Sequence, residues 1–170
     1  MAISRESIRY VHEKAEKHPF AQSLAQGTIC RSKWDAYLFN WMILHKTIEE
    51  RHVIKKDQLL RTDRLFYDLI DCRGRTPLVG NTLKYCDYLN DIDVDKLWSH
   101  VYVHYLAHLY GGQHIREQIN WSSRFLLFED PEGCIKYIRD NCENADTDEA
   151  ISAFDWTIKI FDDLDALPIY

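Results

Sequence analysis

Residues 100–120 form a helical pattern that contains two adjacent glycines. The apolar and aromatic residues of this stretch recur at helical spacing, at Val103, Leu106, Tyr110, Ile115 and Ile119. Gly111 and Gly112 stand inside the pattern, where each glycine costs about 1 kcal/mol relative to alanine. A chain that keeps both needs bare backbone there. The use is either a kink or tight packing contact, or the close approach of a flat, bulky partner.

The rest of the sequence is also helical in pattern, and none of it alternates as a strand would. We expect helices at about 4–17, 20–25, 33–53, 57–71, 81–89, 133–141 and 147–164, with the glycine-containing helix after the acidic turn 91–95. The length of 170 residues suits one domain. The sequence therefore predicts an all-α fold in a single domain that spans residues 1–170.

The composition narrows the class of protein. A net charge of −6 argues against a general nucleic-acid binder. The five cysteines form no Cys-x-x-Cys pair, which indicates reduced thiols in a cytosolic compartment. No apolar run approaches 18 residues and no signal-peptide core is present. We therefore expect a cytoplasmic chain without a membrane span.

His12 stands out among the eight histidines because Glu16 follows it by one helical turn. A carboxylate that holds one imidazole nitrogen is typical of a histidine whose other nitrogen ligates a metal. Arg5 and Arg9 precede His12 by seven and three residues, so the three side chains share a stripe of the helix. Two guanidinium groups beside a metal ligand suit an anion. The alternative is a solvated face, on which a His–Glu pair contributes a few tenths of a kcal/mol.

Two other histidine patterns raise the possibility of a metal cage. Glu49 and His52 form one Glu-x-x-His, the motif of di-iron carboxylate bundles, but those bundles need a second copy that this sequence lacks. His104 and His108 are four residues apart, without the glutamate that a zincin places between its histidines. We therefore give more weight to a site built around His12.

Two segments together resemble the haem oxygenase family. Residues 11–16 read Val-His-x-x-Ala-Glu and, with His18-Pro19-Phe20 after them, resemble the proximal helix of that family. Residues 105–113, which end in Gly-Gly-Gln, resemble its distal helix, and residues 153–164 resemble its C-terminal helix. The similarity extends from about residue 4 to residue 165.

The resemblance implies a helical fold in which haem lies between the proximal and distal helices. The implied reaction is the oxidative cleavage of haem to biliverdin, of the IXα isomer, with release of carbon monoxide and ferrous iron. Haem is then both cofactor and substrate, dioxygen is the oxidant, and the electrons come from ferredoxin or an NADPH-dependent reductase.

The resemblance also assigns site residues. His12 would ligate the haem iron through one ring nitrogen, and Glu16 would accept a hydrogen bond from the other. Four basic side chains would meet the haem propionates: Arg5, Arg9, Lys136 and Arg139. Three small residues would bring the distal backbone close to the haem face: Ala107, Gly111 and Gly112. Two aromatic residues would lie in the distal pocket and at the haem wall, respectively: Tyr102 and Phe154.

The chain departs from many members of the family just before the glycine pair. Those members carry Gly-Asp where this chain has Ala107-His108, and their aspartate organises the distal water that supplies protons. Plant-type members resemble this chain in having Ala-His. We expect His108 either to hold the water network itself or only to pack. His45 also stands where many members carry a tyrosine.

The missing aspartate leaves other functions open. One alternative is a haem carrier or sensor that keeps the fold without degrading haem. Another is a di-iron or thiamin-cleaving protein of the same broad helical fold, which predicts no haem binding at all.

Overall fold

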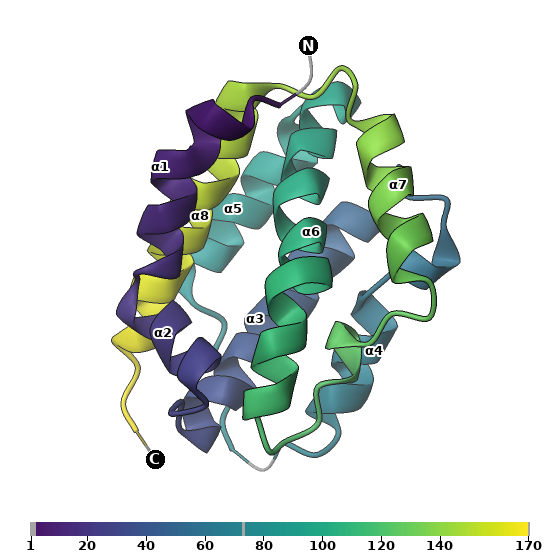
Figure 1. Ribbon diagram of the computed structural model, residues 1–170. Coiled ribbons are helices and arrows are strands. Elements are labelled where there is room, and N and C mark those ends of the chain that lie inside the picture. Colours follow the sequence, from purple (N-terminus) through teal and green to yellow (C-terminus); the bar gives the residue numbers. More distant parts are fainter. Residues whose placement is uncertain (1–2, 73, 170) are drawn as a thin grey trace.

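The structure is a computed structural model that describes residues 3–72 and 74–169 (Figure 1). Helices are the only regular secondary structure in those residues, so the predicted all-α class is confirmed. Their bounds are Arg5–Glu16 (α1), Pro19–Gln26 (α2), Arg31–Glu49 (α3), Thr62–Leu69 (α4), Gly80–Asp91 (α5), Val94–Gln118 (α6), Pro131–Asn141 (α7) and Thr147–Asp165 (α8), with 3-10 turns at Asp57–Leu59 (η1) and Arg124–Leu126 (η2). None of these helices is both long enough and apolar enough to cross a membrane.

Local sequence signals set several of these bounds. Ser4 begins α1, as predicted, because its hydroxyl accepts a hydrogen bond from the backbone N–H of Ser7. Pro19 is the first residue of α2, where its missing N–H costs nothing. Gly27 ends α2 in the left-handed conformation, with φ 67°, which glycine adopts without strain.

The segment 57–71, expected to be one helix, is a 3-10 turn followed by α4. The carboxylate of Glu49 accepts hydrogen bonds from the backbone N–H groups of Arg61 (2.6 Å) and Thr62 (3.2 Å). This cap satisfies the first donors of α4 and fixes its start at Thr62. Because Glu49 comes from the end of α3, local propensity alone does not predict where α4 begins.

The main core forms around α3, which lies behind α6 in Figure 1, with α4 and α7 on one side and α1, α5 and α8 on the other. Its large buried side chains include Trp34, Leu38, Leu44, Ile48, Tyr85, Tyr105 and Phe125. Burying a side chain of this kind contributes roughly 1.5–3 kcal/mol. The core therefore gives α6 a firm support along its inner face.

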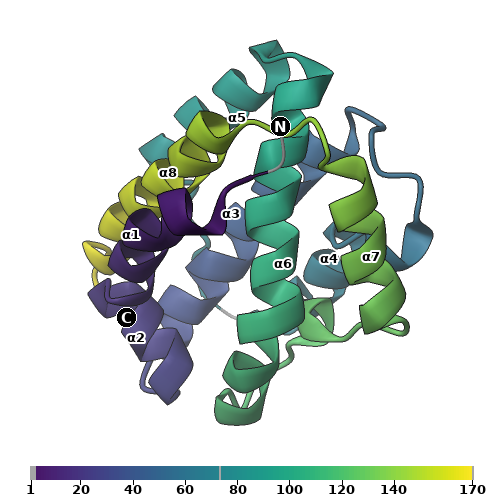
Figure 2. The ribbon, with the colours of Figure 1, turned by 45° about the horizontal axis from the view of Figure 1, so that its top comes forward.

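A smaller apolar cluster fixes α1. It joins three residues of α1 to one of α6 and three of α8: Ile8, Val11, Ala15, Val103, Ala150, Ala153 and Phe154. The alanines on both helices allow a close approach, and α1 runs along α8 (Figure 2). The cluster thereby brings together the two helices that carry the predicted site, α1 and α6.

Candidate functional site

His12 lies on the exposed side of α1, with 49% of its side chain accessible. Its ring packs edge-on against Phe154 of α8, with ring centroids 5.5 Å apart and an interplanar angle of 81°. Its Nδ1 lies 3.6 Å from Oε2 of Glu16, one helical turn later. In the described part of the chain, no hydrogen bond involves its Nε2. One nitrogen thus faces a carboxylate and the other is free, as in a metal-ligating imidazole.

One face of α6 passes from the core to solvent along its length. Val103 is buried in the cluster with α1, whereas Ala107 and Gly111, one and two turns later, are exposed. A Cβ atom built on Gly111 would meet nothing within 4 Å. At positions 107 and 111, α6 therefore presents only backbone and a single methyl group to its surroundings.

The arm formed by α1 and α2 meets α6 at both ends of this exposed stretch. At one end Val103 packs in the cluster with α1. At the other end Gly27 lies against Gln118, whose carbonyl oxygen is 2.6 Å from the place of a Cβ atom on residue 27. The two contacts on α6 are fifteen residues apart, which corresponds to about 22 Å of helix. Exposed surface thus remains on both α1 and α6 between the two contacts, and Figures 1 and 2 show the two helices standing apart, with α1 running along α8.

The two glycines of α6 have different surroundings. Gly112 is buried, and a Cβ atom built on it would lie 2.7 Å from Cδ2 of Leu126 in η2. Gln113 strengthens the same contact, because its Nε2 donates to the carbonyl oxygen of Leu126 at 2.6 Å. Gly112 is therefore explained by packing within the protein, whereas only Gly111 faces open space.

The four basic residues predicted to contact the propionates differ in whether they already have partners within the protein. Arg5 and Arg9 are exposed on α1, and among the described residues neither makes a hydrogen bond or an ion pair. Arg139 of α7 donates to the hydroxyl of Tyr110, the residue before Gly111, at 2.8 Å. Lys136 is paired with Asp140 on its own helix, and both side chains are exposed. Arg5 and Arg9 are thus the cations most available to an anion.

Two aromatic residues of the predicted pocket are mostly buried. Tyr102 is half-buried and packs against both the main core and the cluster around α1. Phe154 is 9% exposed and supports the ring of His12 from behind. Phe154 thus helps to fix the orientation of the imidazole on α1.

His108 is buried and paired with a histidine of α3. Its Nε2 lies 2.9 Å from Nε2 of His45, and Nδ1 of His45 lies 2.7 Å from the carbonyl oxygen of Trp41. Burial lowers the pKa of His45 to about 4, although the nearby Glu49 carboxylate opposes the shift. Burial, together with the neighbouring His45, also holds the pKa of His108 well below its usual range. Both rings are therefore neutral at pH 7.

A model of the Heme oxygenase family matches residues 4–133 of the chain, a range that includes the proximal and distal motifs. The chain belongs to the haem oxygenase family. The enzymes of this family degrade haem to biliverdin, so the protein is an enzyme of haem degradation. The predicted resemblance of the chain to this family is confirmed.

Solved haem oxygenases share the fold at low sequence identity. Haem oxygenase-2 of Synechocystis, solved with haem and NO, aligns at a TM-score of 0.83 and 22% identity, over 94% of this chain and 82% of that one. Haem oxygenase-1 of the same cyanobacterium, solved with haem, gives 0.80 and 20%, over 94% and 89%. The enzyme of Leptospira interrogans gives 0.79 and 20%, over 92% and 95%. A search of curated protein sequences finds no match.

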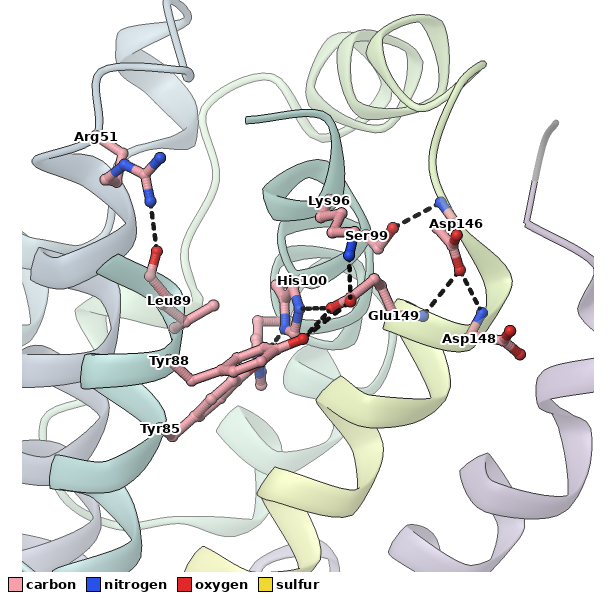
Figure 3. A network of polar contacts seen from close by, with 11 residues as sticks. Arg51, Tyr85, Tyr88, Leu89, Lys96, Ser99, His100, Asp146, Asp148 and Glu149 are labelled. Atoms are coloured by element: carbon pink, nitrogen blue, oxygen red, sulfur yellow. Dashed lines mark hydrogen bonds and ion pairs between the residues drawn. The ribbon is translucent and has the colours of Figure 1, made fainter. Parts of the chain in front are cut away.

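Sequence reasoning missed a hydrogen-bonded chain that leads away from α6 in this haem oxygenase (Figure 3). His100 Nε2 lies 3.0 Å from Oε2 of Glu149, and a carboxylate only accepts, so His100 donates this bond. The Tyr85 hydroxyl then donates to His100 Nδ1 at 2.6 Å. His104 in turn donates from Nε2 to the Tyr85 oxygen at 2.8 Å. The direction of every bond follows from the acceptor at Glu149.

Glu149 forms the outer end of this chain. The Tyr88 hydroxyl donates to it at 2.7 Å, and Nζ of Lys96 lies 3.7 Å away. Partial burial would raise the pKa of Glu149, but the hydrogen bonds from Tyr88 and His100 and the charge of Lys96 lower it overall. The spacing of His100 and His104 is visible in the sequence. Their partners on α5 and α8 are not, because no motif links those segments.

The alternative metal cage at Glu49 and His52 has a different explanation in the structure. Besides capping α4, the carboxylate of Glu49 accepts a hydrogen bond from the Tyr105 hydroxyl at 2.9 Å, and His52 is exposed. Across residues 3–72 and 74–169, no group of three or more His, Cys, Asp and Glu side chains could hold a metal ion. Glu49 thus acts as a structural residue that joins α3, α4 and α6.

Proposed function

We propose that this chain binds haem between α1 and α6, with His12 as the axial ligand, and cleaves it to biliverdin IXα, carbon monoxide and ferrous iron. The position of His12 carries the proposal. Its imidazole is half exposed, faces Glu16 through one nitrogen and has the other nitrogen free. It lies on the helix that meets α6 near the exposed stretch around Gly111. The two Synechocystis enzymes with this fold were solved with haem.

The surroundings of His12 fit a flat, apolar ligand that carries two carboxylates at one edge. At Ala107 and Gly111 the side chains are small or absent, so the backbone of α6 can lie close to a flat ring. Arg5 and Arg9 supply two exposed guanidinium groups on the helix that carries the ligand, and guanidinium groups bind carboxylates through paired hydrogen bonds. Bound haem would supply the iron centre at which dioxygen is activated. The protein then orients the ring, restricts access to one face and supplies protons.

We assign Gly111, rather than Gly112, to the haem face, because the position of its Cβ is open. The role of Gly112 is to allow Leu126 to pack directly against the backbone of α6, which fixes the position of this part of the helix. We assign Arg139 of α7 as a further propionate contact, because it already donates a hydrogen bond to Tyr110, the residue before Gly111. Lys136 can contribute only if it leaves Asp140. His108 is assigned to proton supply on the distal side, with Tyr102 at the edge of the pocket.

The electron donor in this proposal is a ferredoxin or an NADPH-dependent reductase of the cytoplasm. An acidic donor needs a basic docking patch on a chain whose net charge is −6. Lys14 is exposed on α1, and Lys17 is exposed directly after its last residue. Lys14 and Lys17, at the end of α1 and on a different side of it from Arg5 and Arg9, would form the patch.

The test is single-turnover oxidation of the purified haem complex with a reductant and dioxygen. We expect the Soret band to disappear while the absorption of biliverdin grows. His12→Ala should remove the axial ligand, change the absorption spectrum of the complex and stop turnover, and added imidazole should restore part of both. An unchanged spectrum in His12→Ala would contradict the assignment of the ligand.

The alternative drawn from the sequence, a haem carrier or sensor, makes a different prediction for the same experiment. His108 occupies the position of the usual aspartate and is already hydrogen-bonded to His45. A carrier predicts a stable complex that keeps its Soret band under the same conditions, without biliverdin. The same experiment therefore separates the two functions.

A further inference from the structure

The hydrogen bonds around His45 fix which ring nitrogens carry protons. The carbonyl oxygen of Trp41 can only accept, so Nδ1 of His45, 2.7 Å away, is the protonated nitrogen. A neutral His45 then has a lone pair on Nε2. His108 Nε2, 2.9 Å from that lone pair, must therefore be the donor. His108 is thus the Nε2–H tautomer, and its Nδ1 has a lone pair.

The remaining nitrogen of His108 is free within the protein. In the described part of the chain, no hydrogen bond engages His108 Nδ1. His108 also precedes Gly111 by three residues, so the two positions are neighbours on one side of α6, whereas Ala107 lies about 100° further round the helix. The imidazole is therefore adjacent to the exposed backbone that we assign to the haem face.

We propose that His45 is a positioning residue that locks His108 as its Nε2–H tautomer, so that His108 Nδ1 serves as a hydrogen-bond acceptor for water on the distal side. The inference rests on the proposed function for its catalytic consequence, although not for the tautomer itself. It explains how a histidine can take the place of an aspartate. A carboxylate is an acceptor only, and the locked imidazole offers an acceptor at its one free nitrogen.

The pairing also orients the ring. His108 packs edge-on against Phe125, with ring centroids 5.3 Å apart and an interplanar angle of 88°. His45 and His108 have centroids 4.9 Å apart, and His45 is itself held by Tyr105 at 5.0 Å. The ring of His108 is thus held by Phe125 and His45, and its Nε2 is hydrogen-bonded. Its free Nδ1 therefore has a defined direction. A defined direction is what a proton-supplying water network needs.

The first test is nitrogen-15 NMR of the imidazole rings in the full, haem-free chain, which reports the tautomer of each histidine. We expect His108 to be protonated at Nε2 alone at neutral pH. His45→Phe should shift His108 towards the Nδ1–H tautomer, since it removes the acceptor. His45→Gln should keep the wild-type tautomer, because its amide can donate to Trp41 and accept from His108. A wild-type His108 protonated at Nδ1 would overturn the inference.

The second test is the rate of haem cleavage in the same variants. We expect His45→Phe to bind haem as tightly as the wild type but to cleave it about tenfold more slowly, and His45→Gln to recover most of the rate. Thr47→Val is the matched control. It removes a hydrogen bond within α3, from the Thr47 hydroxyl to the carbonyl oxygen of Ile43, and leaves the contacts of His108 unchanged. Equal cleavage rates in His45→Phe and the wild type would refute the positioning role.

The two tests separate this inference from the proposed function. The tautomer is measured without haem, so a chain that fails to bind haem refutes only the proposed function. If His45→Phe does not fold, the wild-type spectrum and His45→Gln still decide the tautomer and the rate. Loss of the Nε2–H tautomer in His45→Gln, with an unchanged rate, would count against the positioning role.

Discussion

Leu126 occupies the space that a side chain on residue 112 would need: its Cδ2 lies 2.7 Å from the place of a Cβ atom on Gly112. Gln113 holds the backbone of the same leucine through its carbonyl oxygen. A side chain on the adjacent Gly111 would meet nothing within 4 Å. Packing within the protein therefore excludes a side chain at Gly112, whereas the proposed reason for Gly111 is its place at the haem face.

The glycines should accordingly respond in opposite ways to the same substitution. Gly111→Ala should raise the free energy of unfolding of the haem-free chain by about 1 kcal/mol, because it adds helix propensity without a clash. It should also weaken haem binding, since its methyl group lies where the ring would approach. Gly112→Ala should be about 1–3 kcal/mol less stable than Gly111→Ala because Leu126 must move. Urea unfolding and haem titration of both variants measure these effects. Equal stability of the two variants would contradict the packing argument.

The loop that carries Leu126 depends on buried charged groups. The guanidinium of Arg61 is fully buried and donates to the carbonyl oxygens of Phe125 and Leu127 at 2.9 and 2.8 Å. The carboxylate of Asp68 accepts from the backbone N–H groups of Arg124 and Phe125, both at 2.9 Å. These bonds hold η2, and with it Leu126, against α6.

Asp68→Asn should therefore loosen this loop. The amide retains one acceptor oxygen, so one backbone donor loses its partner at a cost of about 1–3 kcal/mol in the free energy of unfolding. Hydrogen exchange at the amides of Arg124 and Phe125 should accelerate. Asp63→Asn is the control: it removes the same charge from the same helix, at a position that is exposed to solvent. If both variants exchange alike, Asp68 does not hold the loop.

The sequence predicted the features that one helix contains, and missed those that join two. His12 and Glu16 are four residues apart, so helical geometry alone placed them together. The contact between His45 and His108 depends on how α3 packs against α6, which no local pattern encodes. The same is true of Leu126, whose position separates the roles of Gly111 and Gly112. Periodicity identifies a buried face without identifying its partner.

Stability should fall in mild acid because His45 is buried in its neutral form. Its pKa is about 4 in the folded protein, against a usual value of 6.5, so the unfolded chain binds more protons between these values. The stability present above pH 6.5 is therefore lost as the pH falls towards 4. This shift corresponds to about 3 kcal/mol. His45→Gln should flatten the dependence, as measured by urea unfolding at pH 4.5 and 7. An identical slope in the variant would mean that other groups cause the acid sensitivity.

The basic patch on α1 can be tested by charge reversal. Lys14→Glu combined with Lys17→Glu should lower turnover driven by ferredoxin and weaken its dependence on salt, because charges at the edge of an interface act mainly on the rate of association. Turnover with a small chemical reductant should stay the same. Unchanged salt dependence in the ferredoxin assay would place the docking site elsewhere.

Arg9 should contribute to haem affinity through the propionates. Arg9 is exposed and makes no ion pair with any described residue, so its guanidinium is available to a carboxylate. Arg9→Gln should weaken haem binding about tenfold, as expected for a lost charge-assisted hydrogen bond. It should have little effect on haem dimethyl ester, whose propionates are neutral. Lys46→Gln on α3 makes the same change in net charge at a distant exposed site and is the matched control. An equal loss of affinity for haem and for the ester would show that Arg9 supports the fold of α1 and does not bind a propionate.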